Sequence, residues 1–119
     1  MEQFAQNFVN TFYQAMDQNK MNILNFYQQP STLTFFTRTA QGQQEIAQRM
    51  QATTFKTTKH EIKNMDCQMI QGSPMVIISV IGKLTIDNDN PMIFTETFVL
   101  CQMNNNWFIL NDISEIVQV

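Results

Sequence analysis

The stretch that decides the fold is Met75–Val119, which reads MVIISVIGKLTI, DNDNP, MIFTETFVLCQM, NNN and then WFILNDISEIVQV. Its three apolar runs, at 75–86, 92–103 and 107–117, are rich in Val, Ile, Phe and Thr, which fit a pleated surface. The two polar segments between the runs contain the Asn, Asp and Pro residues that favour chain reversal. The stretch therefore predicts three consecutive antiparallel strands.

The first of these runs has two distinct faces. Because alternate residues of a strand point to opposite sides, one face is apolar to its end: Val76, Ile78, Val80, Gly82, Leu84 and Ile86. The other face begins apolar and becomes polar: Met75, Ile77, Ser79, Ile81, Lys83 and Thr85. We therefore expect a sheet that is covered on both sides over only part of its length.

The residues before this stretch predict three helices. An amphipathic helix is expected over 2–17, a shorter one over 20–28 that Pro30 ends, and a third over 43–52. A strand is expected at 31–36, a chain reversal at 37–42 and extended chain at 54–70. Helices that precede most of the sheet indicate an α+β fold in which helices pack on a curved antiparallel sheet.

Length and composition limit the classes of protein that the chain can belong to. Its 119 residues predict a single domain over 1–119. The net charge of −3 argues against nucleic-acid binding, and a charged fraction of only 14% suggests that part of the surface is covered by another chain. No signal peptide or membrane span is expected, so the sequence predicts a cytosolic or nuclear protein. Cys67 and Cys101 are expected as reduced, buried thiols, with a single disulfide left open.

Catalytic constellations are sparse in this sequence. His60 is the single histidine, and an acid–base pair with Asp66, Glu96 or Asp112 is left open. Both tyrosines are expected on helices, which leaves the strands without a hydrogen-bond donor for an isomerase-like site. No metal-ligand spacing and no glycine-rich phosphate loop is present. The sequence therefore favours binding over catalysis, with no catalytic residue, metal or cofactor.

Several segments resemble the nuclear transport factor 2 family over essentially the whole chain. They are FAQNFVNTFYQAMD in the first helix, Leu33–Phe35, Gln41–Gly42, Phe55 with His60, GKLTIDNDNPMIF at 82–94, and WFILND at 107–112. The resemblance implies a cone in which a strongly bent antiparallel sheet wraps the three helices and leaves a hydrophobic cavity at its wide end. It also implies homodimers formed through the sheet. The function it implies is to carry the GDP-bound Ran GTPase into the nucleus by binding Ran and the FxFG repeats of nucleoporins.

The resemblance also implies site residues. Asp87 and Asp89 match the acids that pair with basic residues of the GTPase, beside a pocket for one of its aromatic side chains, lined by Phe35, Phe55, Leu84, Met92 and Phe94. The chain departs from the family at Phe36, where a third acid is usual, and at Ser114 and Glu115, where an aromatic and a basic residue are usual. Met1 stands in the place of the tryptophan that contacts FxFG repeats, so we expect Met1, Phe4 and Phe8 to supply that apolar surface.

These observations lead to a set of expectations. The chain is expected to be a Ran-GDP import carrier of the cytoplasm, nucleus and nuclear pore, dimerising through the sheet face that contains Ile77 and Ile81. By alternation from Leu33 and Phe35, Phe36 is expected to point to the opposite side of its strand. The alternatives left open are a domain that pairs with an mRNA-export or scaffold protein, and a small-molecule enzyme of the same fold.

Overall fold

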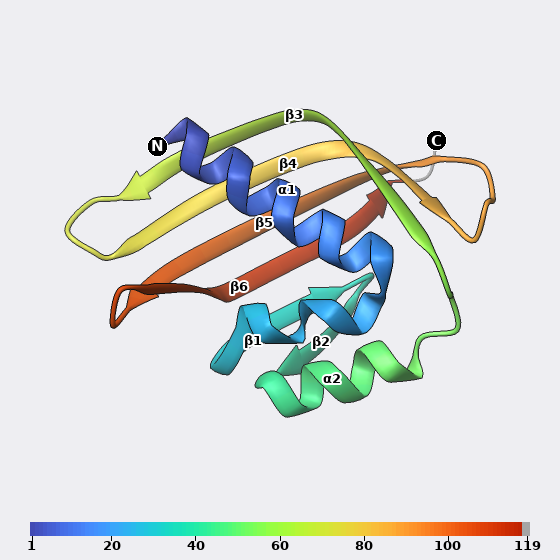
Figure 1. Ribbon diagram of the computed structural model, residues 1–119, viewed down its shortest axis with the longest axis horizontal. Coiled ribbons are helices and arrows are strands. Elements are labelled where there is room, and N and C mark those ends of the chain that lie inside the picture. Colours follow the sequence, from blue (N-terminus) through green and yellow to red (C-terminus); the bar gives the residue numbers. More distant parts are fainter. Residues whose placement is uncertain (118–119) are drawn as a thin grey trace.

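The chain folds into one strongly bent, six-stranded sheet, as a computed structural model that describes residues 1–117 shows (Figure 1). The strands are β1 Tyr27–Phe35, β2 Arg38–Gln41, β3 Thr58–Ile70, β4 Met75–Ile86, β5 Met92–Met103 and β6 Asn106–Val117, in the spatial order β2-β1-β6-β5-β4-β3. All neighbours are antiparallel except β1 and β6, which run parallel. The predicted three-stranded unit is β4, β5 and β6, and it is confirmed.

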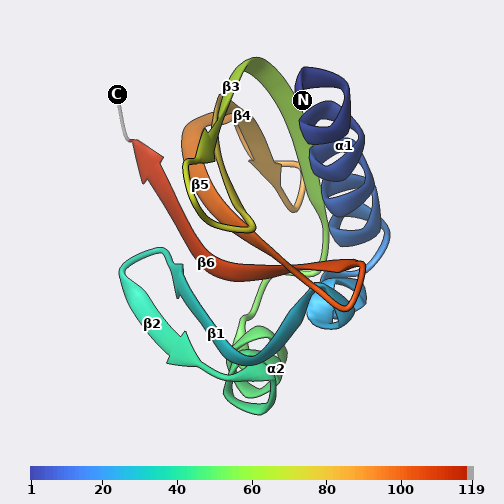
Figure 2. The same ribbon diagram turned by 90° about the vertical axis from the view of Figure 1, so that its left-hand side faces the viewer.

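Three helices cover the sheet. Helix α1, Glu2–Gln18, lies along one face of the long strands and buries Val9, Phe12 and Met16 of its predicted apolar stripe. A 3₁₀ helix, η1 Lys20–Phe26, follows it, and α2, Gln43–Ala52, packs against β1 and β2 (Figure 2). The predicted α+β cone, with three helices packed in a bent sheet, is therefore confirmed.

Two local predictions differ from the structure. The second helix, expected over 20–28, ends at Phe26, and the strand already begins at Tyr27. Pro30 is tolerated within β1 because the ladder to β6 is irregular between Tyr27 and Thr32, where a missing N–H breaks no regular hydrogen bond. The predicted reversal at 37–42 contains strand β2, whose four residues are too few to show a period.

The predicted faces of β4 are those observed. Val76, Ile78 and Val80 are at most 1% exposed, whereas Ile81 on the other face is 43% exposed. Gly82 continues the buried face at the point where the β3–β4 register shifts. A side chain is excluded there, because a Cβ would lie 2.1 Å from the carbonyl oxygen of Glu61.

Candidate functional site

A cavity of about 320 Å³ opens between the β1–β2 hairpin and the C-terminal end of α2. This volume lies at the lower end of the range for ligand pockets. The lining is mostly apolar and aromatic, with two arginines: Leu33, Phe35, Phe36, Arg38, Ala40, Arg49, Ala52, Thr53, Thr54 and Phe55. We refer to it below as the hairpin cavity.

The tight turn of the β1–β2 hairpin forms one wall of the hairpin cavity. Phe35 pairs with Arg38 across the ladder, so Phe36 and Thr37 form a two-residue turn, with φ angles of 50° and 74°. The prediction that Phe36 points away from Phe35 is wrong, because positive φ ends the strand alternation. The two rings lie 3.9 Å apart and line the same cavity.

Phe36 also occupies space beside the terminal strand. Its N–H donates to the carbonyl oxygen of Ser114, and both residues line a small void of about 10 Å³. Ser114 is the residue at which the resemblance described above implies an aromatic side chain. The Phe36 ring thus places an aromatic group next to the position where β6 has none.

The structure separates the five predicted pocket residues into two groups. Phe35 and Phe55 line the hairpin cavity, with their ring centroids 6.0 Å apart. Leu84 and Phe94 are at most 2% exposed; Leu84 lines the small void, and Phe94 packs against Tyr13 in the core. Met92, half-buried, pairs with Leu84 at the start of β5.

The loop that contains Phe55 is held in place by a lysine. Lys20 Nζ donates to the carbonyl oxygens of Thr53 and Phe55, both at 2.8 Å, and to Thr53 Oγ1 at 2.6 Å. The same ammonium group lies 4.8 Å from the centre of the Phe55 ring, within the range of a cation–π contact. Lys20 of η1 therefore holds in place the loop that lines this side of the hairpin cavity.

The acidic turn between β4 and β5 joins the other end of this loop. Asp87 Oδ1 accepts hydrogen bonds from the backbone N–H groups of Thr57, at 2.8 Å, and Lys56, at 2.9 Å. These two bonds hold the pKa of Asp87 below its usual value. Asp89 is exposed, and none of the described residues donates a hydrogen bond to its carboxylate. The turn thus places two acids beside the loop that lines the cavity.

A second acidic pair, which the sequence did not single out, lies inside the fold. Glu96 on β5 and Asp112 on β6 are 5% and 1% exposed. Tyr13 donates to Glu96 Oε1 at 2.8 Å, and Tyr27 donates to Asp112 Oδ2 at 2.7 Å. The expectation that no tyrosine reaches the strands is wrong, because the helix tyrosine Tyr13 points at the sheet and Tyr27 is the first residue of β1.

Burial controls the proton affinity of this inner pair. Loss of water, followed by repulsion from Asp112, raises the pKa of Glu96 well above its usual value. Loss of water also raises the pKa of Asp112, whose Oδ1 has no hydrogen-bond partner among the described residues. The void that Glu96 lines, of about 10 Å³, is close to the volume that one water needs.

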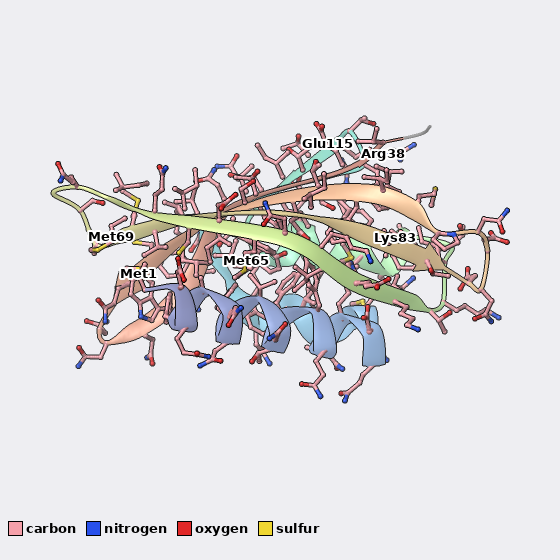
Figure 3. The ribbon with its side chains drawn as sticks, turned by 90° about the horizontal axis from the view of Figure 1, so that it is seen from above. Met1, Arg38, Met65, Met69, Lys83 and Glu115 are labelled. Carbon is pink, nitrogen blue, oxygen red and sulfur yellow. The ribbon has the colours of Figure 1, made fainter. Side chains whose placement is uncertain are left out.

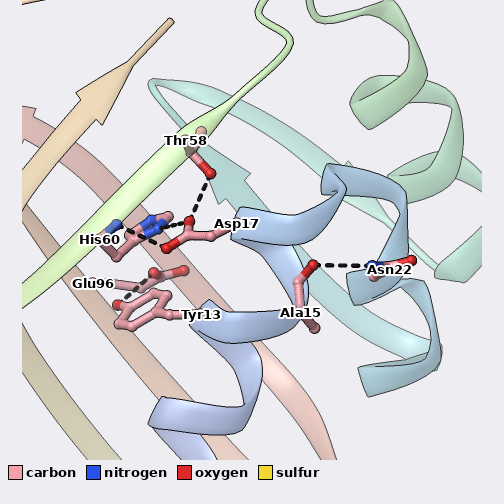
Figure 4. A network of polar contacts seen from close by, with 7 residues as sticks. All are labelled: Tyr13, Ala15, Asp17, Asn22, Thr58, His60 and Glu96. Carbon is pink, nitrogen blue, oxygen red and sulfur yellow. Dashed lines mark hydrogen bonds and ion pairs between the residues drawn. The ribbon is translucent and has the colours of Figure 1, made fainter. Parts of the chain in front are cut away.

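His60 has a different acidic partner from those proposed. Its Nδ1 lies 2.6 Å from Asp17 Oδ1, and its backbone N–H donates to Asp17 Oδ2 at 2.9 Å (Figure 4). None of the pairs that the sequence left open, with Asp66, Glu96 or Asp112, is formed, because the end of α1 brings Asp17 against β3. Burial opposes ionisation of Asp17, but the bonds from His60 outweigh it and lower the pKa of Asp17. The His60 ring stacks on Tyr13 at 4.2 Å.

The predicted nucleoporin-binding residues lie along α1. Met1 is 52% exposed, whereas Phe4 and Phe8 are half-buried. Phe4 packs on Trp107 of β6, with ring centroids 4.9 Å apart, and Phe8 packs against the aromatic core. Trp107, which sequence reasoning did not include, is therefore part of this surface; its place at the start of a strand gave no sign of the contact.

The cysteines and acids offer little metal chemistry. Cys67 on β3 and Cys101 on β5 are free thiols and half-buried, rather than buried as expected. Within residues 1–117, no group of three His, Cys, Asp or Glu side chains is arranged to hold a metal ion. In the same range, no helix combines the length and the apolar composition that crossing a bilayer requires.

This combination of a bent sheet, three helices and an apolar cavity at one end defines the cone-shaped class of α+β domains. A solved structure of nuclear transport factor 2 from Cryptosporidium parvum superposes with a TM-score of 0.90 at 28% identity, covering 98% of this chain and 94% of that one. A yeast deubiquitinase–cofactor complex contains a chain with a TM-score of 0.89 at 16% identity, a likeness of fold alone.

Sequence comparison then identifies the family. The sequence model of the nuclear transport factor 2 domain family matches residues 4–115 of this chain. Nuclear transport factor 2 of Saccharomyces cerevisiae is 32% identical over 92% of this chain and 88% of its own length. The protein of the same name from Emericella nidulans is 30% identical over 98% of this chain and 94% of its own length. The chain belongs to the nuclear transport factor 2 family.

Proposed function

We propose that the chain is a nuclear import carrier, which binds GDP-bound Ran and FxFG nucleoporin repeats in the cytoplasm and nucleus. Family membership supports a transport role, because the relatives from several fungi and from Dictyostelium discoideum are named nuclear transport factor 2. The observation that carries the Ran proposal is the position of two exposed acids beside an aromatic cavity. Binding, not catalysis, is the proposed activity.

The cavity and the acidic turn have separate roles in the proposed Ran site. An aromatic side chain of the GTPase enters between Phe35 and Phe55 and is removed from water there, which provides affinity. Asp87 and Asp89 attract basic residues of the GTPase and fix its register. The proposed site also includes, as packing residues behind Phe35 and Phe55, Leu84, Met92 and Phe94. One oxygen of Asp87 is engaged in the 56–57 loop, so Asp89 is the freer partner.

The nucleoporin site is proposed at the start of α1. Met1 exposes an adaptable apolar side chain, and Phe4 with Trp107 forms an aromatic surface next to it. Such a surface suits the phenylalanine rings of an FxFG repeat. Phe8 supports it from the core side.

Homodimerisation is proposed through the sheet face that α1 leaves uncovered. Ile81 on β4 and Ile113 on β6 are 43% and 48% exposed there, and Ile77 lies on the same face of β4. Burying this apolar area contributes roughly 25 cal/mol per Å² to association. Equilibrium sedimentation at micromolar concentration is expected to show twice the 13.9 kDa chain mass, and a purely monomeric protein would contradict this part of the proposal.

The Ran proposal is tested by changing charge without changing shape. In calorimetry, the double variant Asp87→Asn, Asp89→Asn should bind Ran-GDP at least about tenfold more weakly, since loss of a partly desolvated charge pair costs about 2–5 kcal/mol. The matched control is Asp66→Asn, an exposed acid of β3. Unchanged affinity of the double variant would reject the acidic turn as a binding element.

A further inference from the structure

The hairpin cavity has a charge opposite to that of the molecule. The chain carries a net charge of −3, yet the described residues that line the cavity include two arginines and no Asp or Glu. Lys20 adds a third cation at the Phe55 ring, and its ammonium group is bonded only to uncharged oxygens. The cavity is therefore an apolar space in a locally positive environment.

The two arginines approach the cavity from different elements. Arg38 is the first residue of β2 and lies directly opposite Phe35 in the ladder, so both side chains stand on the same face of the hairpin. Arg49 lies in the last turn of α2. Their positions follow from the backbone of a strand and a helix, which fixes the spacing of the two charges better than a loop would.

Neither guanidinium group is already neutralised. The ion pairs among residues 1–117 are His60–Asp17 and Lys63–Glu61, and neither includes an arginine. Figure 3 shows Arg38 and Glu115 in the part of the molecule away from α1, and no ion pair joins them. Both guanidinium groups are thus available to an incoming carboxylate.

We infer that the hairpin cavity selects an aromatic side chain, supplied by a partner protein, that carries acidic residues on the side facing Arg38 and Arg49. The ring fills the space between Phe35, Phe36 and Phe55, and the flanking carboxylates pair with Arg38 and Arg49, whose planar fork matches a carboxylate. This inference rests on the proposed function in one respect, which is that the cavity receives a residue of a protein partner.

The acids beside the cavity make the occupant's charge pattern directional. Asp87 and Asp89 lie beyond the loop at 53–57, whereas Arg38 and Arg49 lie at the hairpin and the helix. A matching partner surface therefore carries acidic residues on the hairpin side of its aromatic anchor and basic residues on the side of the acidic turn. An arrangement with two signs fixes the orientation of the partner, which a uniformly acidic rim does not do.

The test uses two blocked tripeptides, Asp-Phe-Asp and Asn-Phe-Asn, titrated into the whole chain and followed by backbone amide NMR. Asp-Phe-Asp should bind about fivefold more tightly than Asn-Phe-Asn at low salt, since exposed pairs contribute modestly, and the difference should shrink at high salt. Shifted signals should lie at Ala52 and Phe55.

Matched variants decide the outcome. The double variant Arg38→Gln, Arg49→Gln should bind Asp-Phe-Asp and Asn-Phe-Asn equally, whereas Lys63→Gln, which removes an exposed cation of β3, should keep the preference. Equal binding of the two peptides to the unaltered chain overturns the inference. Binding of free phenylacetate as tight as that of Asp-Phe-Asp also overturns it, because the cavity would then be a small-molecule site.

Ran-GDP separates this inference from the proposed function. If Ran-GDP does not bind while the peptide preference holds and depends on the arginines, the Ran proposal fails and the selectivity of the cavity stands. If Ran-GDP binds equally to the unaltered chain and to the double arginine variant, and the peptides show no preference, the selectivity fails and the Ran proposal stands.

Discussion

Two hairpins of the sheet turn with the same backbone geometry and opposite residue chemistry. The β5–β6 turn consists of Asn104 and Asn105, with φ angles of 53° and 66°, and the β1–β2 turn consists of Phe36 and Thr37. Asn tolerates positive φ, whereas a bulky or β-branched residue is strained there. The β5–β6 turn therefore follows from the local preference of its residues. The β1–β2 turn adopts a conformation that its residues disfavour.

The packing around Phe36 explains what holds the strained turn. Its ring lies against Phe35, and its N–H bonds to β6. Strained backbone of this kind costs about 1–3 kcal/mol and persists where the surrounding structure over-determines it, which is common at binding sites. The comparison teaches that the hairpin of the cavity is fixed by contacts, and the hairpin far from it by its own residues.

The largest effect is expected when the residue types of the strained β1–β2 turn are placed in the β5–β6 turn. Asn104→Phe with Asn105→Thr should lower the free energy of unfolding by about 2–3 kcal/mol, because two residues then enter the left-handed region without compensating contacts. Urea unfolding measures this. Gln102→Thr, in extended chain nearby, is the control, and an unchanged double variant would break the comparison.

A second feature near the strained hairpin that lowers the free energy of unfolding is the buried acid Glu96, which lines the same small void as Phe36. Because its pKa is raised in the folded state, the free energy of unfolding of the natural chain falls as pH rises above about 4 toward the raised value. Glu96→Gln keeps an acceptor for Tyr13 and should raise stability by about 1–3 kcal/mol at pH 8, with little gain at pH 4. Urea unfolding at the two pH values measures this, with the exposed Glu45→Gln as control. A gain independent of pH would show that charge is not the cause.

Relief of strain at the cavity hairpin is expected to be smaller. Thr37→Gly should raise the free energy of unfolding by about 1 kcal/mol, since glycine adopts φ near 74° without strain but loses more chain entropy on folding. Asn105→Gly should gain less, because asparagine already tolerates its conformation. Thermal unfolding of both variants measures the difference. Equal gains at the two sites would contradict the assignment of strain to Thr37.

The smallest effect is expected at the third positive-φ turn, where Asp87 has a φ of 51°. Its pKa is lowered, mainly by the backbone N–H groups of Thr57 and Lys56, so its contribution to stability is present above its usual pKa and is lost as pH falls through the lowered value. Asp87→Asn tolerates the turn and should flatten this acid-side loss in urea unfolding between pH 5 and pH 2, pH values chosen about the usual carboxyl range. Asp66→Asn should leave the loss unchanged.

The sequence predicted what depends on regular patterns. Strict alternation gave the buried face of β4, and helical spacing gave α1 and α2, because periodic burial leaves its mark on each segment separately. The polar turns were equally predictable, since Asn and Asp are the residues that such turns favour. These elements are sufficient to predict an α+β fold with helices on a curved antiparallel sheet, whereas the cone shape was implied by the resemblance to the family.

What sequence reasoning missed depends on contacts between distant segments. No local signal says that Tyr13 meets Glu96 or that Asp17 meets His60, because each pair is formed by packing α1 against the sheet. The direction of Phe36 was missed for a related reason, since the positive φ of its turn is imposed by the pairing of β1 with β2 and β6. The two arginines of the cavity are brought together by tertiary structure alone.

The position of β6 has a consequence for biosynthesis. This strand lies between β1 and β5, yet it follows the other five strands along the chain. Until β6 is in place, the β1–β2 hairpin and the β3–β5 unit have no strand to join them, and each has an unpaired edge where β6 will add. Contacts between Leu33 and Asp112 close a very long loop, so the sheet is completed after translation has passed β6. A chain whose β6 is not yet in place therefore exposes strand edges that can pair with other chains, and this is the interval in which a chaperone has most to protect.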